Sequence, residues 1–248
     1  MTEHGDDHAR TPSGDGAEKP LVLTRAALLD GSLHRLIARK LPDVKLLTDD
    51  ERAASLHGIL AARPEAAGTD AWLFAYGSLI WNPTVHYAER RVAIVQGWHR
   101  AFCLSVRAGR GTPDNPGLML GLDVGGECRG VAYRIAAEHA EAELHLLWRR
   151  EMVSGAYVPR WVTLLDADGT GFAHGIVFTI NPEANAYTGV LDEEEIVRRL
   201  ATAQGELGSA AEYLFRTRDG LHGLGIRDAL VDRLAEAVAR IHAGEERA

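Results

Sequence analysis

The sequence predicts an α+β fold in which a small mixed or antiparallel β-barrel is packed against helices. Residues 21–65 and the C-terminal third have helical patterns, whereas residues 72–178 have the period of strands with one inserted helix. Glycine and proline punctuate the strand region, as in residues 111–117. Six or seven short strands without regular helix alternation are not typical of a parallel α/β sheet.

Composition and charge narrow the function classes. The chain has 248 residues, 46% of them hydrophobic, and a net charge of −8, which argues against a general nucleic-acid binder. No apolar stretch approaches the ~20 residues of a membrane span, and the polar N-terminus predicts no secretory signal. The two cysteines, Cys103 and Cys128, are too few for a disulfide framework and are expected to be buried. These observations together predict a cytoplasmic protein.

Three regions are expected along the chain. Residues 1–20 are polar and predict a disordered tail, residues 21–70 a helical N-terminal extension, and residues 71–248 the main domain with its C-terminal helices. In the extension, Thr24 is expected to cap a short helix. Thr48 and Glu51 have the spacing of a capping box.

The first strand of the main domain has a distinctive end. The run from Trp72 to Trp81 predicts a buried strand that stops at Gly77-Ser78. Glycine permits the close approach of a bound group, and successive N–H groups in such a turn form an anion site. The alternative is an ordinary turn that closes a core strand. The further expected strands are 92–95, 100–107, 118–124, 130–133, 161–165 and 175–178.

The C-terminal third predicts three helices. Asp192 and Glu195 suit the capped start of a helix that runs through Ala203. A second helix is expected near residues 210–218 and a last one over residues 227–242.

The inserted helix, residues 137–152, carries a carboxylate on its apolar side. At roughly 100° per residue, Glu151 lies near the middle of an apolar arc formed by Ala140, Leu144, Leu147 and Trp148. The charged residues expected outside this arc are Glu138, Glu143, Arg149 and Arg150. Burial and the helix C-terminus both raise a carboxyl pKa, toward values that suit proton transfer near neutral pH. The alternative is a Glu that pairs with a core arginine or reaches out to solvent at the helix end.

Two tyrosines are secondary candidates. Tyr157 follows Glu151 by a few residues, and Tyr213 has apolar neighbours. Because a buried tyrosine usually finds a hydrogen-bond partner, a structural role is the simpler interpretation of each alone.

Three motifs, in this order, resemble the ChaC-like branch of the gamma-glutamylcyclotransferase family. They are Phe74-Ala75-Tyr76-Gly77-Ser78-Leu79-Ile80-Trp81-Asn82-Pro83; Trp148-Arg149-Arg150-Glu151-Met152 with Gly155-Ala156-Tyr157-Val158-Pro159-Arg160-Trp161; and Gly205-Glu206-Leu207-Gly208-Ser209 running into Glu212-Tyr213-Leu214-Phe215. The segment 110–117 also fits, and the resemblance spans about residues 71–230.

The resemblance implies an activity and a fold of the gamma-glutamylcyclotransferase type. In the ChaC branch, glutathione is cleaved by cyclisation of its gamma-glutamyl group, which gives 5-oxoproline and Cys-Gly. By the resemblance, Glu151 is the general base and acid, and the turn formed by Tyr76, Gly77, Ser78 and Leu79 holds the gamma-glutamyl part. Tyr157 and Tyr213 would orient the substrate. This reaction requires no protein nucleophile, metal or organic cofactor.

The motifs depart from the family pattern at three positions. Ala75 stands where the family often has Gly, Glu206 where it often has Pro, and Ala210 where it often has Asn. The loss of the Asn would loosen a substrate contact or a loop, without touching the proposed base.

The expected partner is a small gamma-glutamyl peptide, glutathione, bound by a monomer with no nucleic-acid or membrane partner. Two alternatives stay open at this point. One is a cyclotransferase for another gamma-glutamyl peptide or amine. The other is a non-catalytic binding or regulatory protein on the same fold, since one fold hosts many functions.

Overall fold

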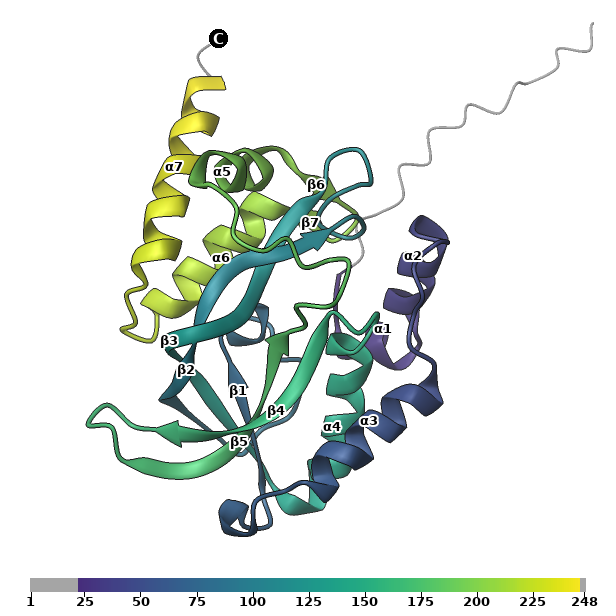
Figure 1. Ribbon diagram of the computed structural model, residues 1–248, viewed down its shortest axis with the longest axis vertical. Helices are drawn as coiled ribbons and strands as arrows, with labels where there is room; N and C mark the ends of the chain where they lie inside the picture. Colours follow the sequence, from purple (N-terminus) through teal and green to yellow (C-terminus); the bar gives the residue numbers. More distant parts are fainter. Residues whose placement is uncertain (1–21, 246–248) are drawn as a thin grey trace, which may run out of the picture.

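The computed structural model describes residues 22–245. The tail predicted to be disordered, residues 1–20, lies outside the described residues. Within residues 22–245, helices are packed around a closed five-stranded barrel, as Figure 1 shows. The predicted α+β class and the small barrel are therefore confirmed.

The barrel closes through one parallel contact. Its strand order is β1-β3-β2-β4-β5, and every neighbouring pair in this order is antiparallel. The first and last strands then meet in parallel, with Leu73 opposite Ile176. The strands are β1 (Ala71–Ala75), β2 (Glu89–Val106), β3 (Gly117–Ile135), β4 (Tyr157–Leu165) and β5 (Gly171–Ile180).

Two strands are much longer than the sequence pattern predicts. The expected strands 92–95 and 100–107 are parts of β2, and 118–124 and 130–133 are parts of β3. The prediction of separate short strands was wrong because a bulge at Gly97, with φ +81°, lets β2 continue through the polar interruption. One long bent ribbon thus supplies most of the barrel wall.

The helices form two groups in Figure 1, with α5 to α7 at the upper end of the barrel and α1 to α4 along one side. They are α1 (Arg25–Leu29), α2 (Ser32–Lys40), α3 (Asp49–Ala61), α4 (Ala137–Glu151), α5 (Glu193–Thr202), α6 (Ala210–His222) and α7 (Ala229–Glu245). Short elements complete the chain: the 3₁₀ helices η1 (Glu65–Ala67) and η2 (Ser78–Ile80), and the hairpin β6 (Gln204–Gly205) and β7 (Gly208–Ser209).

The predicted helix starts are confirmed by their caps. The Thr24 side chain accepts the N–H of Ala27 at the start of α1. Thr48 and Glu51 form the reciprocal capping box of α3. Each such cap stabilises a helix by about 1 kcal/mol.

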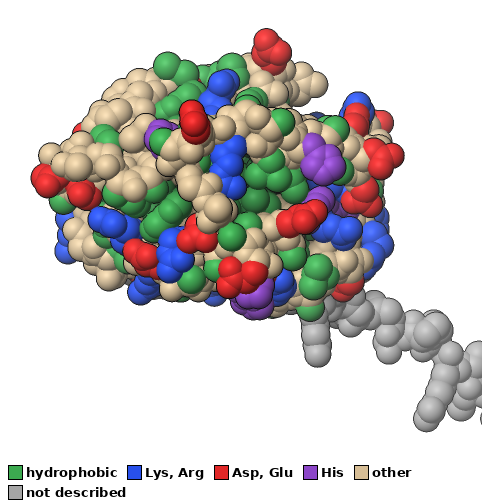
Figure 2. Space-filling view, turned by 90° about the horizontal axis from the view of Figure 1, so that it is seen from below, with side chains coloured by type: hydrophobic (Ala, Val, Ile, Leu, Met, Phe, Trp, Pro, Cys, Tyr) green, Lys and Arg blue, Asp and Glu red, His purple; other side chains and the backbone are tan. Residues whose placement is uncertain are grey.

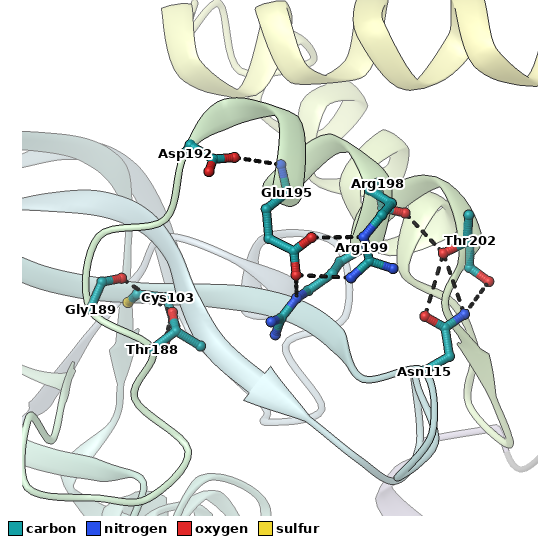
Figure 3. A network of polar contacts seen from close by, with 9 residues as sticks. All are labelled: Cys103, Asn115, Thr188, Gly189, Asp192, Glu195, Arg198, Arg199 and Thr202. Carbon is teal, nitrogen blue, oxygen red and sulfur yellow. Dashed lines mark hydrogen bonds and ion pairs between the residues drawn. The ribbon is translucent and has the colours of Figure 1, made fainter.

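The start and the end of α5 are held by polar contacts, which Figure 3 shows. The Asp192 carboxylate accepts the N–H of Glu195 at 2.8 Å, and the Glu195 carboxylate pairs with Arg198 and Arg199. At the other end, Asn115 in the β2–β3 loop donates to the Thr202 carbonyl at 3.0 Å. The helix is thereby fixed to the barrel ribbon.

The N-terminal helices cover the outer side of α4. The Trp148 indole on α4 donates to the Ser55 hydroxyl on α3 at 3.1 Å. The N–H of Leu47 donates to the carbonyl of Val153, and the Trp161 indole on β4 donates to the carbonyl of Ile59. Helix α4 is therefore enclosed by the barrel on one side and by α1 and α3 on the other.

This enclosure corrects the helical-wheel prediction. Glu143 and Arg150 were expected outside the apolar arc of α4, but both are buried, at 3% and 7% exposure. Glu143 pairs with Arg25 of α1, whose Nη2 donates to Oε1 at 2.8 Å, and it also accepts the N–H of His86. The prediction was wrong because it assumed that α4 has one buried face, whereas α1 covers Glu143 and the segment after β1 contacts Arg150.

The outer surface carries charges of both signs. Figure 2 shows basic and acidic side chains interspersed over one face, together with scattered histidines. Among residues 22–245, no helix combines the length and apolar composition that crossing a bilayer requires.

The substitution Arg25→Met should destabilise the protein by about 1–3 kcal/mol, because it leaves the buried Glu143 carboxylate without its charged partner. Urea unfolding with an unchanged m-value measures this loss. The matched control is Arg35→Met, whose exposed ion pair with Asp30 contributes little. Equal stability of the two variants would contradict the prediction.

Candidate active site

The residues that the sequence analysis singled out come from four separate elements and meet at one small cavity. The turn after β1 supplies residues 76–79, the C-terminal end of α4 supplies Glu151, β4 supplies Tyr157, and α6 supplies Tyr213. The cavity is about 20 Å³, roughly the room that one water molecule needs.

All seven residues that the sequence singles out line this cavity: Tyr76, Gly77, Ser78, Leu79, Glu151, Tyr157 and Tyr213. Four lining residues were not predicted: Phe74, Met119, Leu120 and Phe178. Their apolar side chains belong to strands whose alternation indicates only a core position. The structure brings the predicted residues together, and the role of each stays a proposal.

Glu151 is the carboxyl group of the cavity. It is the last residue of α4, and its side chain is only 13% exposed. Burial raises the pKa of Glu151 above its ordinary value, and the Arg150 guanidinium partly opposes this rise. A carboxyl in this environment can both take up and return a proton near neutral pH.

Arg150 is the residue that the sequence analysis missed. Its side chain is 3% exposed, and its Nε lies 2.9 Å from Oε1 of Glu151. Burial lowers the pKa of Arg150. Glu151 therefore both lines the cavity and pairs with a core arginine, which was the alternative considered for it. The partners of Arg150 outside α4 are Ser78, Asn82 and Thr84, in the segment after β1, and these contacts are not readable from the α4 segment alone.

The hydroxyl groups of the three tyrosines form hydrogen bonds with main-chain groups around the cavity. Tyr157 donates its hydroxyl to the carbonyl of Leu120 at 3.0 Å, and the N–H of Leu120 donates to the Tyr213 hydroxyl at 3.4 Å. Tyr76 donates to the carbonyl of Phe178 at 2.8 Å. Burial raises the pKa of Tyr213 to about 12 and raises those of Tyr76 and Tyr157 well above 10. All three phenols are therefore neutral near pH 7.

Glycine is required at position 77 by the packing of the turn. A Cβ at Gly77 would lie 2.8 Å from the Tyr213 hydroxyl, whose ring is 2% exposed and cannot move aside freely. The turn continues into η2, and the first N–H groups of a helix have no partner within it. Main-chain donors of this kind suit a carboxylate or a developing oxyanion.

The third motif fixes the start of α6. Arg110 in the β2–β3 loop donates to the Ser209 carbonyl at 2.8 Å and pairs with Glu212 at 3.2 Å. The Ser209 side chain caps α6 by accepting the N–H of Glu212. These contacts set the position of Tyr213 one residue further on.

The structure shows the contacts of two residues that depart from the family pattern, Ala210 and Glu206. Ala210 is completely buried, and its N–H donates to the carbonyl of Ala203. The Glu206 carboxylate pairs with Lys40 of α2 at 2.6 Å and accepts the N–H of Gly109. Glu206 therefore attaches the β6–β7 hairpin to the N-terminal helices.

Comparison with known proteins places this geometry in a family. The family model described as ChaC-like protein matches residues 71–241. This chain belongs to the ChaC-like family. The match begins directly after the predicted extension, residues 21–70, whose status as a separate region stays a prediction.

Individual ChaC-like relatives resemble most of the chain. It is 42% identical over 196 residues to the glutathione-specific gamma-glutamylcyclotransferase of Escherichia coli strain K12, a match covering 79% of this chain and 84% of the relative. Gamma-glutamylcyclotransferase 2-3 of Arabidopsis thaliana is 33% identical over 177 residues, covering 68% and 89%. The crystal structure of the glutathione-specific gamma-glutamyl cyclotransferase from yeast aligns with a TM-score of 0.64 at 24% identity, covering 69% of this chain and 96% of that one. At that identity the structural match shows the fold alone.

Replacing the buried carboxyl should change how stability depends on pH. Below the ordinary pKa of about 4.5, Glu151 is protonated in both the folded and the unfolded chain. As the pH rises, the unfolded chain ionises first, so the wild type loses stability until the pH passes the raised folded-state pKa. Gln at this position cannot ionise. The unfolding temperature of Glu151→Gln, relative to wild type, should therefore increase over this pH range.

Calorimetric scans at a series of pH values measure this difference. The matched control is Glu138→Gln, since Glu138 lies exposed on the same helix. A difference that stays flat or falls with pH would contradict the raised pKa.

Proposed function

We propose that this chain cleaves the gamma-glutamyl bond of glutathione by intramolecular cyclisation, releasing 5-oxoproline and Cys-Gly. The observation that carries the proposal is a single buried carboxyl, Glu151, beside a cavity whose wall is the 76–79 turn. The name of the Escherichia coli relative supports the same activity on glutathione, and that of the Arabidopsis thaliana relative supports a gamma-glutamylcyclotransferase.

The reaction needs one group that moves protons. The carboxylate of Glu151 takes a proton from the α-ammonium group of the substrate, and the free amine attacks the γ-carbonyl carbon. The new C–N bond closes a five-membered ring, the ring nitrogen loses its second proton to water, and the bond to the cysteine nitrogen breaks. Glu151 then returns its proton to that departing nitrogen, which leaves as the amine of Cys-Gly. Acid–base assistance of this kind contributes about 10²–10⁴-fold.

Holding the substrate folded contributes more than the proton transfer. Because the nucleophile and the carbonyl belong to one molecule, positioning alone can supply roughly 7–11 kcal/mol. We assign this positioning to Tyr76, Gly77, Ser78 and Leu79, whose N–H groups face the α-carboxylate or the oxyanion. Tyr157 and Tyr213, held by the Leu120 main chain, orient the rest of the gamma-glutamyl group.

The size of the cavity adds a condition to this mechanism. A volume of about 20 Å³ is far smaller than a gamma-glutamyl group. Substrate binding therefore has to displace lining side chains. Met119 is the lining residue suited to this, because it is only partly buried and its side chain is unbranched and flexible.

Purified wild-type protein should release Cys-Gly and 5-oxoproline from glutathione without added metal. Glu151→Gln should lose about 10²–10⁴-fold in kcat, because an amide cannot accept the amine proton. Chromatographic detection of both products measures this, with circular dichroism to show that the variant is folded. Turnover of the variant equal to wild type would exclude Glu151 as the base.

The same assay separates the substrate classes. Gamma-glutamyl-alanine is the comparison substrate, and faster turnover of it than of glutathione would favour another gamma-glutamyl compound. If the wild type turns over neither, a binding or regulatory role on this fold is the better explanation.

We further propose that the enzyme acts as a monomer in the cytoplasm. What supports the compartment is that Cys103 and Cys128 are both free and buried. Light scattering of the purified chain should give the mass of one copy, 26.9 kDa, and twice that mass would contradict the proposal.

A further inference from the structure

The Arg150 guanidinium has an acceptor at each of its three nitrogens. Its Nε lies 2.9 Å from Glu151 Oε1, its Nη2 donates to the Ser78 hydroxyl at 2.8 Å, and its Nη1 donates to the Thr84 hydroxyl at 3.1 Å. The carbonyl of Asn82 also accepts from Nη1. A guanidinium is a rigid planar fork of five donors, so groups bound to it keep a fixed spacing.

Two of these acceptors line the cavity and belong to different elements. Glu151 ends α4, whereas Ser78 lies in the turn after β1. Among residues 22–245, Arg150 is the only ion-pair partner of the Glu151 carboxylate. The arginine thus bridges the proposed base and the turn proposed to hold the substrate.

The other two acceptors lie in the loop 82–84, which forms hydrogen bonds with the N-terminal segment. Asn82 donates to the carbonyl of Leu23 at 2.9 Å, and Arg25 donates to the carbonyl of Thr84 at 3.3 Å. Among residues 22–245, Thr84 is the one non-glycine residue with a positive φ, +57°. A strained backbone persists only where its surroundings hold it, and here Arg25 and Arg150 both donate to Thr84.

Arg150 is also the charged group that faces Glu151. The other titratable groups around the carboxyl are three phenols. They belong to Tyr76 in the turn after β1, Tyr157 on β4 and Tyr213 on α6. Burial keeps these phenols neutral. Burial raises the pKa of Glu151 and Arg150 lowers it, so without the arginine the carboxyl would ionise only at higher pH.

We propose that Arg150 is a positioning residue for the cyclisation: it holds the Glu151 carboxylate and the Ser78 hydroxyl at a fixed spacing, and the 82–84 loop and the N-terminal segment brace it. This inference rests on the proposed function. It extends the active site beyond the groups that contact the substrate.

The pH profile of kcat/KM tests the charge of Arg150. Arg150→Gln should move the acid limb upward by about 1–3 pH units, because the carboxylate loses its cation. Part of its activity should therefore return at alkaline pH. Arg150→Lys keeps the charge, so its acid limb should stay near that of the wild type. Its kcat should still fall about 10- to 100-fold, because an ammonium cannot hold both acceptors in one geometry.

A double-mutant cycle tests the bridge to the turn. Ser78→Ala should lower kcat/KM in the wild type, and it should have a much smaller effect in the Arg150→Lys background, where the bridge is already lost. Equal effects of Ser78→Ala in both backgrounds would overturn the inference. This cycle also decides the question if Arg150→Gln does not fold.

The matched control is Arg149→Gln. Arg149 precedes Arg150 on α4, and its hydrogen-bond and ion-pair partners among residues 22–245 are the carbonyl of Leu29 and the carboxylate of Asp49, neither of which lines the cavity. The Arg149→Gln variant should keep the wild-type pH profile of kcat/KM. If Arg150→Gln has the pH profile and kcat of the wild type, the role of Arg150 is overturned but the proposed function is not. If the wild type releases no 5-oxoproline, both the proposed function and the role of Arg150 are overturned.

Discussion

Glu151 lies 13% exposed at the end of α4, and the side chain of its cation partner, Arg150, is 3% exposed. Removing one member of such a pair leaves an uncompensated buried charge, which is far more costly than the pair itself. The pair therefore requires further acceptors for the remaining guanidinium N–H groups. The structure supplies them from Ser78, Asn82 and Thr84, which is why the segment after β1 takes a fixed course around α4.

The parts of the fold that depend on residues close together in the sequence could be predicted from it. The caps at Thr24, Thr48 and Asp192 each involve a residue three positions further on, and all three form. The strand that ends at Gly77 and the position of Glu151 on its helix are equally local features. The length of β2 was not predictable in this way, because the bulge at Gly97 maintains pairing where the apolar alternation stops.

The charged residues of α4 show where local reasoning ends. A helical wheel gives the angle of Arg150 and Glu143 but not what lies opposite them. Their burial depends on segments far away in the sequence: Glu143 pairs with Arg25 of α1, and Arg150 donates to Ser78, Asn82 and Thr84. Contacts over such distances are set by the whole fold. The gathering of the predicted site residues from four elements likewise follows from barrel closure.

Closure of the barrel has to wait until a distant part of the chain is made. Leu73 pairs with Ile176, so about 100 residues must be added after β1 before its parallel partner exists. At roughly 5–20 residues per second, a ribosome needs about 5–20 s for that length. Throughout this interval the entirely apolar strand β1 lacks at least one of its two neighbours, and such an edge is prone to pair with other chains. The nascent protein therefore passes through a stage at which early contact with a chaperone would be most useful.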